Sequence, residues 1–377
     1  MMRIAVVGPL EVPGTQGGMT RHCLEIYTRL AAVGHDVTFI VANNDGLASY
    51  RGITLRRVPA VKLPGWRRLG YSLIASLLAA SRAYDIVHYH SFSSTGFCFL
   101  PSMRGRSVVV TIHRLEWQDE KWGLVARSFL RWSEWIAMHR ARALISVSRN
   151  FAQDIAHRYP RAVPITYIAN GVDPATPTDP VQVEALGLTP GKYLLFVGRL
   201  VPEKGIDLLA DTVAKLRADG VDVGEIAIVG GGIAGSEYVE QLTVRAAAED
   251  ISLLGLRTGD ELAALYGHAR VFVAPSFHEG QPLTVLEAMS YGLPIVASDI
   301  AAHRELLDDE AILFRSGDPD DFAAALSRLL GSPELADRLA VAGRSRIESG
   351  EFDWNDVASA TKAVLDTVMA VASCASD

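Results

Sequence analysis

Residues 271–289 read VFVAPSFHEGQPLTVLEAM, and they give the clearest indication of the fold class. A short apolar strand, Val271 to Ala274, runs into a polar loop, and helix-forming residues follow Pro282, which suits a first helical turn. Strands that are buried on both faces read as continuous apolar runs and belong to parallel sheets covered by helices. The stretch therefore predicts one strand–loop–helix unit of an α/β domain.

The same unit recurs along the whole chain in two series. In the first half, strands are predicted at residues 4–8, 36–41, 86–90, 108–113 and 143–147. Prolines and glycines then cluster between Asn170 and Lys192, and strands resume at residues 193–197, 226–229, 251–254, 271–274, 295–297 and 311–314. We therefore expect two Rossmann-like doubly wound domains that face each other across a cleft, at residues 1–175 and 188–350. Residues 351–377 are expected to form a helix that crosses back to the first domain.

Length, composition and charge narrow the class of protein. A chain of 377 residues suits two cores rather than one. We found no apolar run of the ~20 residues that a spanning helix needs and no signal-peptide core, so we expect a cytoplasmic protein. The three cysteines lack the C-x-x-C spacing of a zinc site. Residues 1–180 hold 21 Lys and Arg against 12 Asp and Glu, whereas the remainder holds 15 against 31.

Two motifs at strand ends contain the charged residues that we predict to bind a ligand. Glu279 is predicted in a loop and Glu287 about one turn inside the following helix. Backbone N–H groups around Gly280, Gln281, Pro282 and Leu283 would attract a diphosphate, and Glu287 would accept hydrogen bonds from a ribose. Arg199 and Lys204 flank the loop after the strand at residues 193–197, where they would stabilise the charge of a departing diphosphate without a metal ion. Taken singly, the carboxylates also suit capping or solvated positions, and the cations suit the surface.

Three other patterns leave alternatives open. Gly230 to Gly235 match G-x-G-x-x-G, but no acidic residue ends the next strand, which argues against a dinucleotide site. We predict instead that Gly232 lets the backbone approach a sugar or phosphate, with a plain tight turn as the alternative. Gly17 and Gly18 form a loop suited to a phosphate or an acceptor. His113 ends a strand and would touch the transferred sugar or align the acceptor, with a purely structural role as the alternative. Together with His90 and Glu116 it lacks zinc-site spacing, so no metal site is predicted. Asp318 is predicted to cap the helix that begins at Pro319.

With these residues in place, the chain resembles glycosyltransferase family 4 over nearly its whole length. The resemblance includes Gly17-Gly18, His113, Asn170-Gly171-Val172-Asp173, Gly198-Arg199 with Glu203-Lys204-Gly205, and the pair Glu279 and Glu287. It implies the GT-B fold and transfer of a sugar from a nucleotide donor with retention of configuration. Arg199 and Lys204 would bind the diphosphate, Glu279 the sugar and Glu287 the ribose, with His113 lining the sugar site. The catalytic set is then His113, Arg199, Lys204 and Glu279.

Two segments depart from the patterns of the family. The common Glu-Gly-Phe-Gly-Leu is here Glu279-Gly280-Gln281-Pro282-Leu283, and Arg114 replaces the glycine of a His-Gly-Leu-Asp-Trp-Gln pattern. We expect a UDP-sugar donor, a glycan, lipid-linked or small-molecule acceptor, no cofactor and no nucleic acid. A nucleotide-sugar epimerase of the same fold and a non-catalytic nucleotide-sugar sensor are the alternatives.

Basic residues and tryptophans also accumulate in two clusters of the first half, which predicts peripheral contact with an anionic membrane at its inner face. The alternative is a solvated basic face whose tryptophans belong to the core. The first cluster holds Arg51, Arg56, Arg57, Lys62, Trp66, Arg67 and Arg68, and the second holds Lys121, Trp122, Arg127, Arg131, Trp132, Trp135, Arg140 and Arg142.

Overall fold

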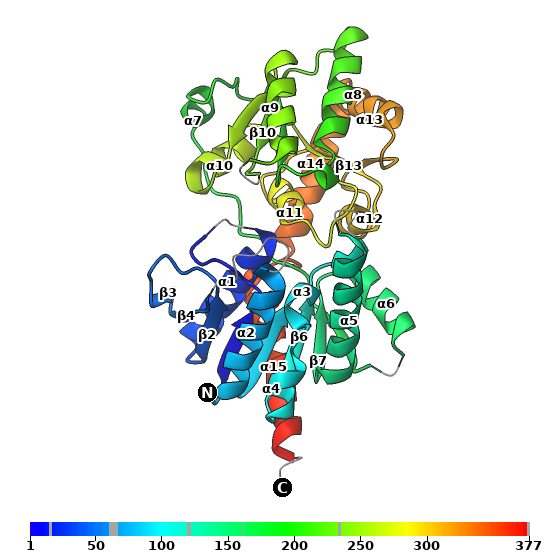
Figure 1. Cartoon of the computed structure of the whole chain (residues 1–377). Coiled ribbons are helices and arrows are strands. Elements are labelled where there is room, and N and C mark those ends of the chain that lie inside the picture. Colours follow the sequence, from blue (N-terminus) through cyan, green and yellow to red (C-terminus); the bar gives the residue numbers. More distant parts are fainter. Residues whose placement is uncertain (15–16, 60–66, 119–121, 161, 233–234, 375–377) are drawn as a thin grey trace. The chain divides into compact units, whose positions relative to one another are not determined.

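The structure is a computed structural model that describes the chain except residues 15–16, 60–66, 119–121, 161, 233–234 and 375–377. It divides into two compact units (Figure 1). Unit 1 comprises Met1–Gly171 and Trp354–Asp377, and unit 2 comprises Val172–Asp353. The segment after Asn170, expected as a linker, therefore packs mostly with unit 2. No helix of the described chain is long and apolar enough to cross a membrane.

Unit 1 is built on an eight-stranded sheet in the order β3-β4-β2-β1-β5-β6-β7-β8. Every neighbouring pair is parallel except β3 with β4, at one edge. The strands are β1 (Arg3–Val7), β2 (Asp36–Val41), β3 (Ser49–Tyr50), β4 (Ile53–Arg57), β5 (Ile86–His90), β6 (Ser107–Ile112), β7 (Ala143–Ser146) and β8 (Ile165–Tyr167). Every residue of β5 and β6 is buried, because helices cover both faces of the sheet.

The helices of unit 1 connect these strands, and the chain's last helix joins them. They are α1 (Gly18–Ala32), α2 (Arg67–Ser81), α3 (Phe92–Thr95), α4 (Phe99–Met103), the 3₁₀ turn η1 (Glu116–Gln118), α5 (Leu124–Arg140), α6 (Arg149–Arg158) and α15 (Trp354–Cys374). Helix α15, red in Figure 1, packs on α1 and contacts β6. Arg29 donates to the Asn355 side chain at 3.0 Å, and a Cβ added at Gly171 would lie 2.5 Å from the Trp354 ring. The C-terminal helix is thus part of unit 1.

Unit 2 is built on a six-stranded, wholly parallel sheet in the order β11-β10-β9-β12-β13-β14. Its strands are β9 (Tyr193–Val197), β10 (Glu225–Val229), β11 (Ser252–Gly255), β12 (Val271–Ala274), β13 (Ile295–Ser298) and β14 (Ile312–Phe314). Its helices are α7 (Val181–Glu184), η2 (Pro202–Lys204), α8 (Ile206–Ala218), α9 (Glu237–Ala248), α10 (Gly259–Gly267), α11 (Leu283–Ser290), α12 (Ala301–Leu307), α13 (Pro319–Leu330) and α14 (Pro333–Glu348). Asp318 caps α13 as predicted, accepting from the N–H groups of Asp320 and Asp321 at 3.0 and 3.1 Å.

The strand order of each sheet indicates where a ligand would bind. In unit 1 the order reverses between β1 and β5, and in unit 2 between β9 and β12. Ligands of open parallel sheets bind beyond the carboxyl ends of the strands at such reversals, because the loops on either side diverge there and leave room. The loops after β1, β5, β9 and β12 are therefore the ones that chemistry would use.

Candidate functional site

The two loops at the strand reversal of unit 2 are fastened to each other. The Phe277 N–H donates to the Glu203 carbonyl at 3.0 Å. Gly205 has φ +69, and a Cβ at this position would lie 2.1 Å from the Pro275 carbonyl oxygen. Only glycine allows this close approach, because it tolerates positive φ and has no side chain. The Lys204 and Glu279 segments are thereby brought side by side.

Lys204 and Glu279 form an ion pair at this reversal. The Ser276 hydroxyl donates to the same carboxylate at 2.9 Å, and the two charged side chains are only 15% and 14% exposed. Burial acts to raise the pKa of Glu279, but the charge and hydrogen bond of Lys204 outweigh it, so that the pKa lies below its ordinary value. At neutral pH Glu279 is therefore an ionised carboxylate beside Lys204.

Arg199 lies on the same loop but reaches solvent. Its side chain is 54% exposed, and its guanidinium lies 3.8 Å from the Glu203 carboxylate. One carboxylate oxygen at that distance does not occupy the five donors of a guanidinium. Arg199 can therefore bind a second anion.

Helix α11 carries the rest of the predicted donor motif. Pro282 is the N-cap of α11, one residue before the first turn where we expected it, and its carbonyl accepts from the Val285 N–H at 3.2 Å. Leu283 opens the helix, so the backbone N–H groups at its N-terminus, next to Gly280 and Gln281, form a positive pole. Glu287 lies one turn into the helix as predicted, and it is buried.

Glu287 has a partner that sequence reasoning missed. The Tyr266 hydroxyl donates to its carboxylate at 2.7 Å, and the Tyr266 ring stacks on Tyr291 at 5.7 Å between centroids. Buried Tyr266 thus holds the carboxylate in one place. The tyrosine lies in α10, before β12, so no rule about residues after strands could identify it.

His303 is a second residue that the sequence analysis passed over. It is fully buried at the start of α12 and lines one pocket together with Lys204, Ser276, Glu279 and Thr284. Its Nδ1 lies 2.8 Å from the Ser298 carbonyl and therefore carries the proton, whereas Nε2 has no hydrogen-bond partner among the described residues. Its position just after β13 is the signal that would have found it.

The glycine-rich loop after β10 is explained by packing. Gly230 has φ +154, and a Cβ there would lie 1.7 Å from the Gly198 carbonyl oxygen, while a Cβ at Gly232 would lie 2.3 Å from Val239. The Gly231 carbonyl accepts from the Leu200 N–H at 3.1 Å. These glycines thus hold the loop against the Arg199 segment, which favours the tight-turn alternative for Gly230 and leaves ligand contact at Gly232 a prediction.

In unit 1 the strand reversal gathers histidines. His90 ends β5, His113 follows β6, and His22 projects from α1, which begins at Gly18 after its N-cap Gly17. His90 Nδ1 lies 3.1 Å from His113 Nε2, and His22 Nδ1 lies 2.8 Å from the Asn170 side-chain oxygen. Burial lowers the pKa of His22 to about 4 and holds the pKa values of His90 and His113 well below their ordinary value. Sequence reasoning included His113 and missed His22.

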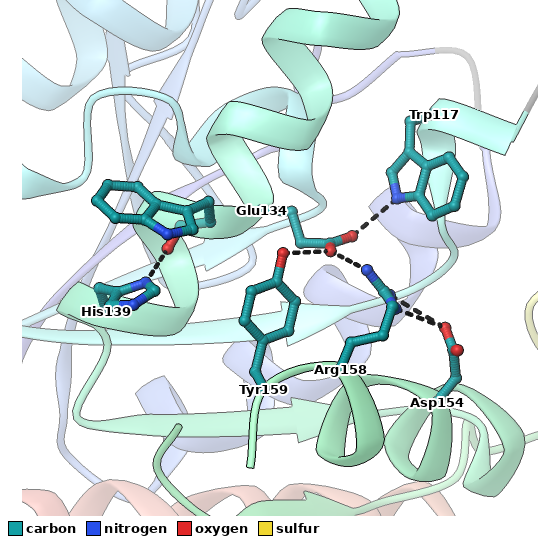
Figure 2. Close-up of polar contacts among 7 residues, drawn as sticks. Trp117, Glu134, His139, Asp154, Arg158 and Tyr159 are labelled. Atoms are coloured by element: carbon teal, nitrogen blue, oxygen red, sulfur yellow. Dashed lines mark hydrogen bonds and ion pairs between the residues drawn. The ribbon is translucent and has the colours of Figure 1, made fainter. Parts of the chain in front are cut away.

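The segment after His113 is fixed by two buried carboxylates. Glu116 accepts from the Ser93 N–H at 2.7 Å and the Ser93 hydroxyl at 3.0 Å, so it does not join the histidines. Figure 2 shows the second carboxylate, Glu134, between Trp117, Arg158 and Tyr159. The Trp117 indole and the Tyr159 hydroxyl donate to it at 2.8 and 2.9 Å, and Arg158 pairs with it. This network fixes the position of Trp117, which follows His113 in the chain.

Family models match both halves of the chain. Residues 16–176 match the family model described as Glycosyltransferase Family 4, and residues 191–332 match Glycosyl transferases group 1. The chain is 31% identical to the D-inositol 3-phosphate glycosyltransferase of Frankia alni, over 93% of this chain and 95% of that protein. Among solved structures, sucrose-phosphate synthase from Thermosynechococcus elongatus aligns with a TM-score of 0.85 at 20% identity, covering 98% of this chain and 100% of that one. Anabaena HepE in complex with UDP-glucose aligns with a TM-score of 0.81 at 18% identity, covering 97% and 100%.

Proposed function

Because the chain belongs to glycosyltransferase family 4 and has the GT-B fold, we propose that it moves a sugar from a UDP-sugar donor to an acceptor hydroxyl, with retention of configuration and without a metal ion. One observation carries the proposal: the largely buried Lys204–Glu279 pair lies at the strand reversal of unit 2, with Arg199 on the same loop. The UDP-glucose bound to the similarly folded HepE protein supports the choice of donor.

Charge stabilisation at the diphosphate is the main task of this site. When the bond from the sugar C1 to the diphosphate breaks, negative charge builds on the leaving oxygens. Lys204, Arg199 and the N-terminus of α11 supply fixed positive charge there, in place of a metal ion. Glu279, held ionised by Lys204, accepts hydrogen bonds from sugar hydroxyls, and Glu287, held by Tyr266, accepts them from the ribose.

Retention follows from attack on the face that the diphosphate leaves. The acceptor oxygen bonds to C1 as the C1–diphosphate bond breaks, and the acceptor proton passes to a departing phosphate oxygen. No side chain need act as a nucleophile, because rate enhancement comes from alignment of the two substrates and from the preset charges. Glu279 suits this scheme because its pairing with Lys204 favours a role in binding the sugar over a role as a nucleophile.

The acceptor side involves unit 1 and a membrane surface. Helix α5 exposes Leu124 and Val125, each 83% exposed, together with Trp132 and Trp135 at 39% and 47%. Arg131 and Arg140 are also exposed on it, whereas its one acidic residue, Glu134, is buried and paired. A helix with apolar, tryptophan and arginine side chains and no exposed acid suits the headgroup region of an anionic bilayer, at the inner membrane face. We therefore favour a lipid-linked acceptor.

The other basic cluster supports this surface less well. Arg51 lies 3.7 Å from Glu25 and so has an acidic neighbour. Lys62, Trp66 and, in the second cluster, Lys121 lie outside the described residues, as does the side chain of Arg67. The proposed membrane contact therefore rests on α5.

A donor screen tests the proposed function. UDP-, GDP- and dTDP-sugars are added to the purified chain, and a donor at 100 times its Kd should add about 2.7 kcal/mol to its stability. Lys204→Ala should abolish this gain, whereas Lys215→Ala, which removes an exposed surface lysine paired with Asp320, should leave it intact. Equal stabilisation of both variants would overturn the assignment.

Incubation with the donor alone separates the competing functions. Slow hydrolysis or no change supports transfer, whereas an isomer of the sugar would indicate an epimerase, which needs acid and base carboxylates of its own. A sensor would bind donor and show no turnover with any acceptor. EDTA should leave sugar transfer largely unchanged; complete loss that only magnesium restores would refute metal independence.

A further inference from the structure

The histidines at the strand reversal of unit 1 surround one point. The ligand nitrogens of His22, His90 and His113 all lie within 4.8 Å of one another. His90 Nδ1 and His113 Nε2 are 3.1 Å apart. His22 and His90 are buried and His113 is half-buried, so the cluster can be reached from the His113 side.

The spacing of the three rings matches that of imidazoles on a shared ion. With a Zn–N distance of 2.0–2.1 Å, a ring centre lies about 3.2 Å from the metal, so two rings on a tetrahedral ion have centres about 5 Å apart. The observed ring centroids are 4.7, 5.4 and 5.6 Å apart. Shifts of about 1 Å in the ring positions would bring the nitrogens to the ~3.4 Å spacing of a tetrahedral site.

Two of the rings are also held by their second nitrogens. The Asn170 side-chain oxygen lies 2.8 Å from His22 Nδ1, which leaves Nε2 of that ring for an ion. The Tyr27 hydroxyl lies 3.2 Å from His90 Nε2 and 2.6 Å from His88 Nδ1, which leaves His90 Nδ1. Metal-binding histidines usually have their other ring nitrogen fixed in this way, because the bond sets the tautomer and the orientation of the ring.

We propose that His22, His90 and His113 bind one divalent transition-metal ion of the zinc class, with water in the fourth position. Three neutral imidazoles and an open position are a known ligand set for zinc. The site belongs to unit 1, whereas Lys204 and Arg199 belong to unit 2. It goes beyond the proposed function, because sugar transfer from the donor does not require it.

Metal content and titration test this proposal on the tag-free full chain. The chain is purified, its zinc content is measured by elemental analysis, and the metal is removed by chelation and dialysis. Zn²⁺ is then titrated by calorimetry, and Co²⁺ by absorption, since tetrahedral cobalt has intense visible bands. We expect one equivalent to bind with a Kd of micromolar or below. Absence of any stoichiometric binding to the wild-type chain would overturn the proposal.

Variants locate the ion. His22→Gln and His113→Gln should each weaken Zn²⁺ binding by at least about 100-fold, and Tyr27→Phe by roughly 10- to 100-fold through the His90 ring. His278→Gln, at an exposed histidine of unit 2, is the matched control and should bind like the wild type. Circular dichroism checks the fold of each variant. Of these variants, His113→Gln should disturb the fold least, because His113 is half-buried. Unchanged binding in folded His22→Gln and His113→Gln would place the ion elsewhere and refute the site.

Discussion

Replacing Lys204 with methionine should destabilise unit 2 strongly at neutral pH and weakly in mild acid. Removing one member of a buried ion pair leaves an uncompensated charge, which costs about 3–5 kcal/mol. Glu279 can instead take up a proton, and from an ordinary pKa near 4.5 this sets a ceiling of roughly 3–4 kcal/mol at pH 7. The ceiling falls by about 1.4 kcal/mol per pH unit, to about 1 kcal/mol at pH 5.

The stability of the wild type should depend on pH in the opposite direction, because its Lys204–Glu279 pair stabilises the fold only while Glu279 is ionised. The pKa of Glu279 in the folded protein is lowered, so its contribution to stability is present above the pKa of the unfolded chain and is lost as the pH falls through the folded value. The wild type should therefore lose stability below about pH 4.5, while Lys204→Met and Glu279→Gln converge toward it.

A double-mutant cycle measures the pair itself. Lys204→Met, Glu279→Gln and the double variant are unfolded in urea, and the double variant should lose less than the two single losses combined, by about 2–3 kcal/mol. The exposed pair of Lys215 and Asp320 is the matched control, with an expected coupling below about 1 kcal/mol.

The tryptophans make the assay specific for unit 2. All six tryptophans lie within the sequence of unit 1, so fluorescence follows that unit, whereas circular dichroism follows both. The variants should shift the circular dichroism transition of unit 2 and leave the fluorescence transition in place. A Lys204→Met loss below about 0.5 kcal/mol at pH 7, or losses that simply add, would show that Lys204 and Glu279 are not a coupled ion pair.

Three further predictions test other parts of the chain. Arg199→Ala should lower UDP release from the donor in the presence of acceptor by about 100- to 1000-fold with the fold intact, because the side chain is exposed; near-normal turnover would end its role at the diphosphate. Gly205→Ala should destabilise unit 2 by more than about 2 kcal/mol in urea unfolding. The control Gly220→Ala should cost about 1 kcal/mol, because Gly220 also has a positive φ, +77, but no atom lies within 4 Å of the added Cβ. Equal losses would contradict the close approach of Gly205 to Pro275. Arg131→Glu with Arg140→Glu should abolish co-sedimentation with anionic vesicles at low salt, while Arg257→Glu in unit 2 should not; a chain that ignores such vesicles, or a double variant that still binds, would rule out α5 as the contact.

Local sequence patterns were enough to predict the class of fold and the residues at the strand ends. Eleven strands were predicted from apolar runs, and each has a counterpart within about one residue at either end, because burial on both faces is written locally in consecutive side chains. The strands β3, β4 and β8 were missed. β4 contains Arg56 and Arg57 and β8 lies at the sheet edge, so neither forms a continuous apolar run.

The contacts between distant side chains could not be predicted from local patterns and are visible only in the folded chain. Arg199, Lys204, Glu279 and Glu287 were identified from their places after strands, but the pairing of Lys204 with Glu279 joins residues 75 positions apart. The contact of Tyr266 with Glu287, and that of His22 with Asn170 across 148 positions, left no local pattern. Such contacts depend on the order of strands in each sheet, which is set by packing between distant segments and not by the periodicity of any one of them.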